Sequence, residues 1–324
     1  MVIKKYFLFV FLLIVASGTQ FVLPQAYLEE VRACRLLEQG QAEEALKLVE
    51  SKLKRYPRNY DCLLYKGLAL YFLGDQEEAF KVLEKVEFET EKLAKAGGTL
   101  EAGKRLQAFS QEDMYLAQRS GVVFTKKRKG LLKYALGILD KRKKDYKRAR
   151  KHLEEALKAE YLPDEARRQL CLINCFLKDY KEGEKIIQPL LASAQKEATV
   201  SFLKAYLDYY LGRQKEARKS LEELADHFLL ARKDLACLLY NDKQYQESLA
   251  IWESLVEENP KDIYAQRNRA RCYFYLGEKE KAQQIFDDLG LKLKVEKYSP
   301  PTIPLILEDL FPQPRFDFLC DIRK

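Results

Sequence analysis

The chain has 324 residues, of which 47% are hydrophobic and 33% are charged. This balance is that of a folded, soluble protein and excludes an intrinsically disordered chain. The formal net charge is +8, but residues 126–151 hold thirteen Lys or Arg and two Asp, a local sum of +11, so the remainder sums to −3. The basic character therefore belongs to one segment.

The N-terminal residues have the pattern of an export signal. Two lysines precede an unbroken apolar run over residues 6–16, and small residues then offer a cleavage position after Gly18. This order predicts a signal peptide over residues 1–18 and an exported protein, periplasmic or otherwise extracytoplasmic. The alternative is an uncleaved membrane anchor that extends to about residue 23, because a spanning helix needs about 20 apolar residues.

A pattern with a period of 34 residues occupies most of the remaining chain. Its units begin at Ala26, Tyr60, Gly130, Asp164, Ala198, Leu229 and Ile263. The eighth residue of every unit is small: Ala33, Gly67, Gly137, Cys171, Ala205, Ala236 and Ala270. The twentieth is also small: Ala45, Ala79, Ala149, Gly183, Ala217, Ser248 and Ala282. The twenty-fourth is large and apolar: Val49, Leu83, Leu153, Ile187, Leu221, Trp252 and Phe286.

Within each unit, apolar spacings of three and four predict two amphipathic helices that pack antiparallel where the small residues meet. A glycine ends the first helix in four units, at Gly40, Gly74, Gly212 and Gly277. Lys144, Lys178 and Lys243 stand at this place in the other three units, so we expect a different turn geometry there. The chain is thus predicted to be an all-α series of helical hairpins.

This pattern resembles the tetratricopeptide repeat family. The residues most typical of that family are Gly67, Tyr273, Trp252, Phe286, Pro57 and Pro260. The resemblance implies a right-handed superhelical solenoid of antiparallel helix hairpins. Related helical-hairpin solenoids, such as Sel1-like repeats, are the structural alternative.

The pattern also divides the chain. Two units cover residues 26–93 and five cover residues 130–289, and the glycine-rich residues 94–129 between them are predicted to be a divergent helix pair. The proline-rich residues 290–324 are predicted to cap the last hairpin, with a docking arm as the alternative.

Catalytic chemistry has little basis in this sequence. There are two histidines, His152 and His227, and no phosphate loop, dinucleotide motif, nucleophile elbow or paired-histidine metal motif. We predict no enzyme activity, cofactor, metal or small-molecule substrate. The seven cysteines are interpreted as small buried residues, in preference to metal or redox sites.

The family resemblance implies that the first helix of each unit lines a concave groove. In the last three units the lining residues are Phe202, Tyr206, Tyr209, Lys233, Tyr240, Tyr264, Arg267, Arg271 and Phe274. Aromatic rings provide contact area and arginine binds carboxylates, so this groove is predicted to bind a protein or peptide segment of acidic character. The alternative is that several of these tyrosines only pack against neighbouring helices.

The basic segment is a second candidate site, for an anionic membrane or glycan. Its residues are Lys126, Lys127, Arg128, Lys129, Lys141, Arg142, Lys143 and Lys144. Nucleic acid is not expected, because the segment lacks interleaved aromatics for base stacking. A solvated helix face is the plainer interpretation. The sequence therefore predicts an extracytoplasmic interaction scaffold, in envelope assembly or secretion, with a membrane- or glycan-bound adaptor as the alternative.

Overall fold

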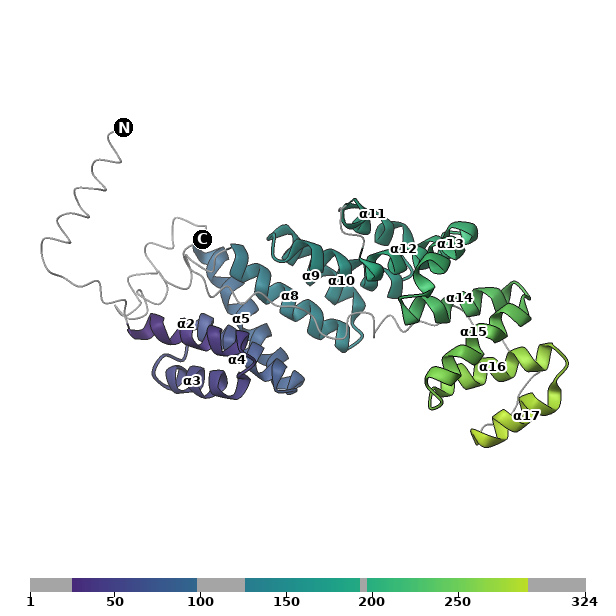
Figure 1. The fold of residues 1–324 in the computed structure, drawn as a ribbon. Helices are drawn as coiled ribbons and strands as arrows, with labels where there is room; N and C mark the ends of the chain where they lie inside the picture. Colours follow the sequence, from purple (N-terminus) through teal and green to yellow (C-terminus); the bar gives the residue numbers. More distant parts are fainter. Residues whose placement is uncertain (1–24, 98–125, 193–196, 291–324) are drawn as a thin grey trace, which may run out of the picture. The chain divides into compact units, whose positions relative to one another are not determined.

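The structure is a computed structural model that describes residues 25–97, 126–192 and 197–290. Within these ranges every regular element is an α-helix (Figure 1). The predicted signal peptide, most of the predicted divergent pair and nearly all of the proline-rich tail lie outside the described residues. What was predicted for those three segments stays a prediction.

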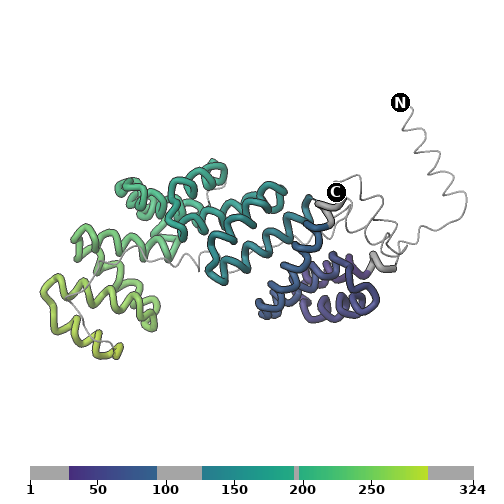
Figure 2. Tube along the Cα trace, turned by 180° about the vertical axis from the view of Figure 1, so that it is seen from behind, coloured from purple at the N-terminus to yellow at the C-terminus, as the bar shows by residue number. Residues whose placement is uncertain are grey.

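The described helices follow one another in pairs joined by short turns, and the same succession can be traced from behind in Figure 2. The pairs are α2 (Gln25–Glu38) and α3 (Ala42–Arg55), α4 (Tyr60–Phe72) and α5 (Gln76–Gly97), α8 (Lys126–Arg142) and α9 (Tyr146–Lys158), α10 (Pro163–Phe176) and α11 (Tyr180–Leu191), α12 (Ala198–Tyr210) and α13 (Gln214–Ala225), α14 (Leu229–Asn241) and α15 (Tyr245–Glu258), and α16 (Ile263–Tyr275) and α17 (Lys279–Asp288). The prediction of an all-α fold built from helical hairpins is confirmed.

The small and large residues of the repeat are buried in every pair. Gly67 on α4 shows why the eighth position is small. A Cβ atom built on Gly67 would lie 2.5 Å from Cδ2 of Leu83, the large residue at the twenty-fourth position on α5. The two helices can therefore cross at this separation only because the glycine leaves room for the leucine.

The turns between paired helices share one geometry, which contradicts the expectation drawn from their lysines. Lys144, Lys178 and Lys243 have φ of 62°, 59° and 63°, in the same left-handed region as the glycines of the other turns. The hydrogen bonds match as well: Asp145 N donates to Asp140 O at 3.0 Å, as Arg213 N donates to Asp208 O at 2.8 Å in a glycine turn. The helix-ending hydrogen bonds evidently outweigh the strain of about 1–2 kcal/mol that a left-handed lysine costs.

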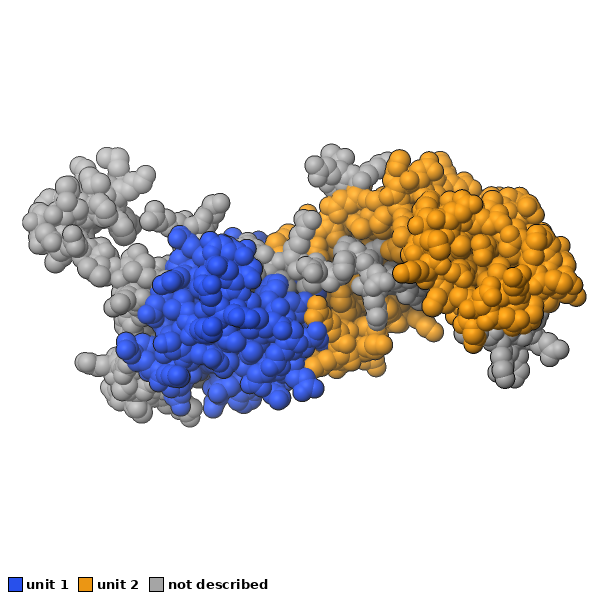
Figure 3. Space-filling view, turned by 60° about the horizontal axis from the view of Figure 1, so that its bottom comes forward, with its two compact units in different colours: residues 1–139, 158–161, 316–324 blue, residues 140–157, 162–315 orange. Residues whose placement is uncertain are grey.

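The chain forms two compact units, coloured separately in Figure 3. Unit 1 consists of residues 1–139, 158–161 and 316–324, and it contains α2 to α5 and most of α8. Unit 2 consists of residues 140–157 and 162–315, and it contains α10 to α17 and nearly all of α9. In unit 2, α11 packs on α12, α13 on α14 and α15 on α16, so hairpins from α10 onward stack in sequence order.

Candidate functional site

The predicted groove residues lie on α12, α14 and α16, the first helices of three consecutive hairpins in unit 2. Their exposure divides them into two sets. The buried set is Phe202, Tyr206, Lys233, Tyr240 and Arg271, with 3–9% of each residue exposed. The partly exposed set is Tyr209, Tyr264, Arg267 and Phe274.

The buried aromatic residues pack hairpins together. The ring of Phe202 meets that of Phe228 with centroids 5.4 Å apart, and the ring of Tyr206 lies 6.4 Å from that of Tyr180 on α11. Tyr240 has Tyr245 at 5.3 Å and Tyr275 at 5.6 Å. At these three positions the alternative interpretation, packing against neighbouring helices, describes the contacts seen.

Lys233 connects α14 to the start of α16. Its Nζ lies 2.6 Å from Oδ2 of Asp262 and 5.9 Å from the ring centroid of Tyr264. Asp262 is also the N-cap of α16, because its side chain accepts a hydrogen bond from Ala265 N at 3.0 Å. Burial acts against the charged carboxylate, but the bonds from Lys233 and the backbone still lower the pKa of Asp262. Lys233 is thus a buried structural link between α14 and α16.

Two arginines one helical turn apart make α16 electropositive. Arg267 is partly exposed, whereas Arg271 is 8% exposed and donates from Nη1 to Oδ1 of Asn268 at 2.6 Å. Burial, and next the charge of Arg267, lower the pKa of Arg271 to about 10. An anionic group beside this pair would be stabilised, because it would offset both the desolvation and the mutual repulsion.

The sequence reasoning missed Asp234 on α14. Its side chain is buried with 4% exposure, and burial raises the pKa of its carboxyl well above the usual range. Its charge contributes to raising the pKa of Tyr210 on α12, of Cys237 on its own helix and of Tyr264 on α16. Asp234 directly follows Lys233 in the chain. A prediction that also included the sequence neighbours of each lining position would therefore have named it.

The basic segment is partly neutralised by unit 1. Nζ of Lys126 lies 2.5 Å from Oε1 of Glu160, and Nη1 of Arg128 lies 2.5 Å from Oδ2 of Asp61. Burial raises the pKa of Asp61 to about 6, against the opposing effect of Arg128. Farther along α8, Lys141 donates to Oε1 of Gln169 at 2.8 Å. The exposed members of the predicted patch are Lys126, Lys127, Lys129, Arg142, Lys143 and Lys144.

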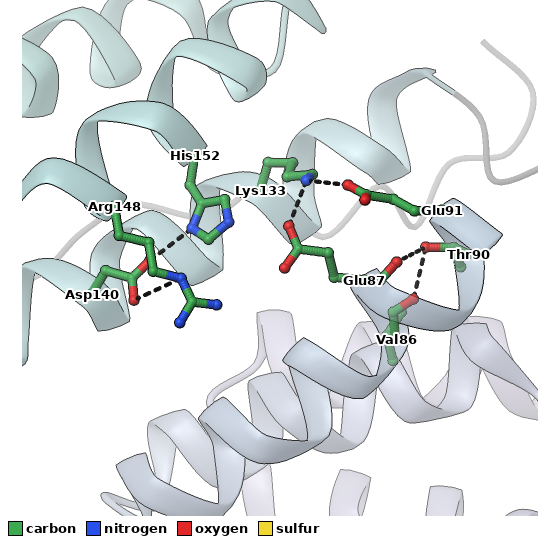
Figure 4. Close-up of polar contacts among 8 residues, drawn as sticks. All are labelled: Val86, Glu87, Thr90, Glu91, Lys133, Asp140, Arg148 and His152. Carbon is green, nitrogen blue, oxygen red and sulfur yellow. Dashed lines mark hydrogen bonds and ion pairs between the residues drawn. The ribbon is translucent and has the colours of Figure 1, made fainter. Parts of the chain in front are cut away.

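Lys133 lies within the same basic run but is buried, with 2% of its side chain exposed. Its Nζ is 2.5 Å from Oε1 of Glu87 and 2.8 Å from Oε1 of Glu91, both on α5 (Figure 4). The hydrogen bond from Lys133 is the main cause that lowers the pKa of Glu91. This lysine is a structural charge that joins α8 to α5.

Neither histidine is among the candidate surface residues. His152 is 3% exposed, and its Nδ1 lies 2.7 Å from Oδ2 of the buried Asp140, which Arg148 also approaches (Figure 4). His227 is exposed in the turn after α13. In the part of the chain that the structure describes, no group of three His, Cys, Asp or Glu side chains is arranged to hold a metal ion. None of the described helices is long and apolar enough to cross a bilayer.

Comparison with known proteins agrees with this architecture. A family model described as the tetratricopeptide repeat matches residues 31–94 and 233–289. U-box domain-containing protein 70 of Oryza sativa subsp. japonica is 32% identical over 106 residues, which are 31% of this chain and 12% of that protein. The chain thus spans about an eighth of that curated relative's length.

A solved structure supports the same assignment at the level of fold. The crystal structure of a tetratricopeptide repeat protein from Parabacteroides merdae ATCC 43184 aligns with a TM-score of 0.55 and 15% identity, over 89% of this chain and 98% of that one. At this identity the likeness concerns the fold alone. Residues 31–94 and 233–289 therefore match the tetratricopeptide repeat, and the described helices share the fold of a tetratricopeptide repeat protein.

Proposed function

We propose that this protein is a non-enzymatic scaffold that binds a protein or peptide segment of acidic character on the first helices of its last three hairpins. Stacked helical hairpins present an extended surface of a kind suited to protein–protein interaction, and that coarse role follows from the fold. The finer proposal rests on the partly exposed set, Tyr209, Tyr264, Arg267 and Phe274.

These side chains combine two useful properties. The aromatic rings supply apolar contact area at a low entropic cost, because only two torsions have to be fixed. Arg267 and the neighbouring Arg271 supply positive charge on α16, which favours a carboxylate of the partner. The buried set holds the three hairpins in register beneath this surface.

We place this activity outside the cytoplasmic membrane, in envelope assembly or secretion. The support is the sequence of residues 1–23, with its basic start, apolar run and small residues. The same residues, left uncleaved, would anchor the protein to the membrane.

A second candidate function is an adaptor for anionic membranes or glycans. It is supported by the exposed Lys127, Lys129, Lys143 and Lys144. Each basic residue near an anionic bilayer contributes about 1 kcal/mol, so these four side chains would matter together. The ion pairs of Lys126 and Arg128 make this candidate the weaker one.

The experiment uses variants at partly exposed positions, where folding should be spared. The double variant Tyr209→Ala with Arg267→Glu should reduce crosslinking of partners in the producing organism by about tenfold or more. The matched control, Lys219→Glu, makes the same charge reversal at an exposed site on α13 and should leave crosslinking unchanged. Equal crosslinking by all three proteins would exclude this surface as the binding site.

The adaptor is tested separately with vesicles of phosphatidylglycerol. Binding that falls steeply with salt, and is lost when Lys127, Lys129, Lys143 and Lys144 are all changed to Gln, would favour it over the scaffold. Absence of salt-sensitive binding would remove it.

A further inference from the structure

One buried carboxylate on α14 lacks a partner. Asp234 is 4% exposed, and in the part of the chain that the structure describes it takes part in no hydrogen bond or ion pair. Burial raises the pKa of its carboxyl, and no neighbouring charge offsets this effect. A carboxylate taken out of water without hydrogen bonds or a counter-charge is costly. Asp234 therefore makes the free protein less stable than a neutral residue of the same shape would.

The cations close to Asp234 in the chain and on α16 are engaged with other residues. Nζ of Lys233 lies 2.6 Å from Oδ2 of Asp262, and Nη1 of Arg271 donates to Oδ1 of Asn268 at 2.6 Å. Neither cation lowers the pKa of Asp234. Among the described residues, the protein thus supplies no counter-charge of its own to this carboxylate.

The carboxylate is nonetheless within reach of a binding partner. The fully enclosed polar atoms without a hydrogen bond include Nδ2 of Asn268 but neither oxygen of Asp234, so the exposed part of Asp234 includes its carboxylate. Its charge helps to raise the pKa of Tyr210 on α12 and of Tyr264 on α16, and both of these tyrosines are partly exposed. Tyr264 belongs to the partly exposed set of the proposed binding surface. A group bound beside Tyr264 would therefore lie within range of the charge of Asp234.

We infer that Asp234 receives a lysine or arginine side chain of the bound segment. The inference rests on the proposed function and deepens it, since the segment then carries a basic residue as well as the acidic residue that Arg267 favours. A cationic side chain supplies the counter-charge that Asp234 lacks, and the faces of the Tyr210 and Tyr264 rings also attract a cation. A neutral side chain leaves the carboxylate unpaired, and an acidic one is repelled, so this position selects for a basic residue.

The test uses a random-peptide display library bound to the full-length protein. With the wild type, we expect the enriched peptides to share an acidic residue and a Lys or Arg at a fixed spacing. Asp234→Asn keeps the shape of the side chain and should abolish the enrichment of Lys or Arg, while the acidic residue stays enriched. Arg267→Glu should do the reverse. The matched control, Asp226→Asn, changes an exposed aspartate after α13 and should enrich the same peptides as the wild type.

One enriched peptide then measures the pairing. Replacement of its basic residue by norleucine should weaken binding to the wild type by about tenfold or more, but binding to Asp234→Asn by less than about twofold. Acidic peptides enriched without a basic residue, or a basic residue still enriched by Asp234→Asn, would overturn the inference and leave the proposed function intact. Absence of any enriched peptide would overturn the proposed function, and this inference with it.

A stability measurement separates binding from a structural role. Asp234→Asn should unfold at a urea concentration equal to or above that of the wild type, because the variant removes an unpaired buried charge. A lower midpoint for Asp234→Asn would show that the carboxylate already has a stabilising partner within the fold, and would overturn the inference.

Discussion

Buried ion pairs join neighbouring hairpins in both compact units, as Lys233 and Asp262 do in unit 2, but unit 2 adds a recurring aromatic stack. In unit 1 the contacts include buried ion pairs: Lys133 with Glu87 joins α8 to α5, and Arg128 with Asp61 joins α8 to α4. In unit 2 an aromatic stack recurs, in which the first residue of a second helix meets the last turn of the next first helix. The stacked pairs are Tyr146 with Phe176, Tyr180 with Tyr210, and Tyr245 with Tyr275, at centroid distances of 4.6, 4.7 and 5.0 Å.

One repeat pattern is therefore compatible with two kinds of contact between hairpins, the buried ion pair and the aromatic stack. A buried ion pair stabilises only while both partners are present, because a single buried charge left behind is expensive. A stack of two rings loses its contribution gradually as contact area is removed. Unit 1 should therefore respond sharply to charge and pH, and the stacked hairpins of unit 2 should respond to ring size.

The largest effect is expected at Lys133. Its replacement by Met should lower the free energy of unfolding by about 3–5 kcal/mol, because Glu87 and Glu91 lose their buried counter-charge. Urea unfolding followed by circular dichroism measures it. Changing both glutamates to Gln in the Lys133→Met background should restore much of the loss.

The matched control for Lys133 is Lys81→Met. Lys81 pairs with Glu78 at 3.6 Å on the exposed face of α5, so we expect a loss below about 1 kcal/mol. If the two lysine variants lose similar amounts of stability, the comparison between the units is wrong.

Asp61 should make the stability of unit 1 depend on pH. The folded pKa of about 6 exceeds the ordinary value near 4, so the folded chain binds the proton more tightly. The free energy of unfolding should then fall as the pH rises from 4 to 6, by about 3 kcal/mol relative to Asp61→Asn, and the difference should level off above pH 6. Urea titrations of both proteins at several pH values measure this difference in the free energy of unfolding. A difference that does not change with pH would contradict the prediction.

A smaller effect is expected from the stack of Tyr180 on Tyr210. Tyr180→Ala should cost about 2 kcal/mol, because it removes both the stack and its buried apolar area. Tyr180→Phe keeps the ring and should retain most of the stability. If Phe is as damaging as Ala, the hydroxyl group is what matters, and the stack does not join these hairpins as argued. Thermal and urea unfolding measure both variants.

The smallest effect is expected at a lysine turn. Lys178→Gly should raise stability by about 0.5–1 kcal/mol, because glycine adopts a φ of 59° without strain. Lys185→Gly, at an exposed position inside α11, should instead lower stability by about 1 kcal/mol. A loss of stability at Lys178 would show that the lysine turn is not strained.

Sequence patterns predicted the hairpins well and the candidate surface less well. Gly67 and Leu83 reveal their packing through spacing, because a helix repeats its face every three to four residues. Tyr206 and Tyr240 occupy positions expected to line a groove, yet they pack against Tyr180 and Tyr275, because these ring contacts depend on the residues of the adjacent hairpin. Asp234 was missed because its burial, with 4% exposure, is a property of the packed hairpins that its place in the sequence does not reveal.

The sequence by itself determined the all-α hairpin architecture, because burial of small and large residues at a fixed period leaves helices few other ways to pack. Only the tertiary structure decided which individual polar residues are buried and which partners they have. Lys133 looks like one more member of a basic run until α5 places two carboxylates beside it. The lysine turns are left-handed because the hydrogen bonds that end the helix stabilise them more than the residue's own preference opposes them.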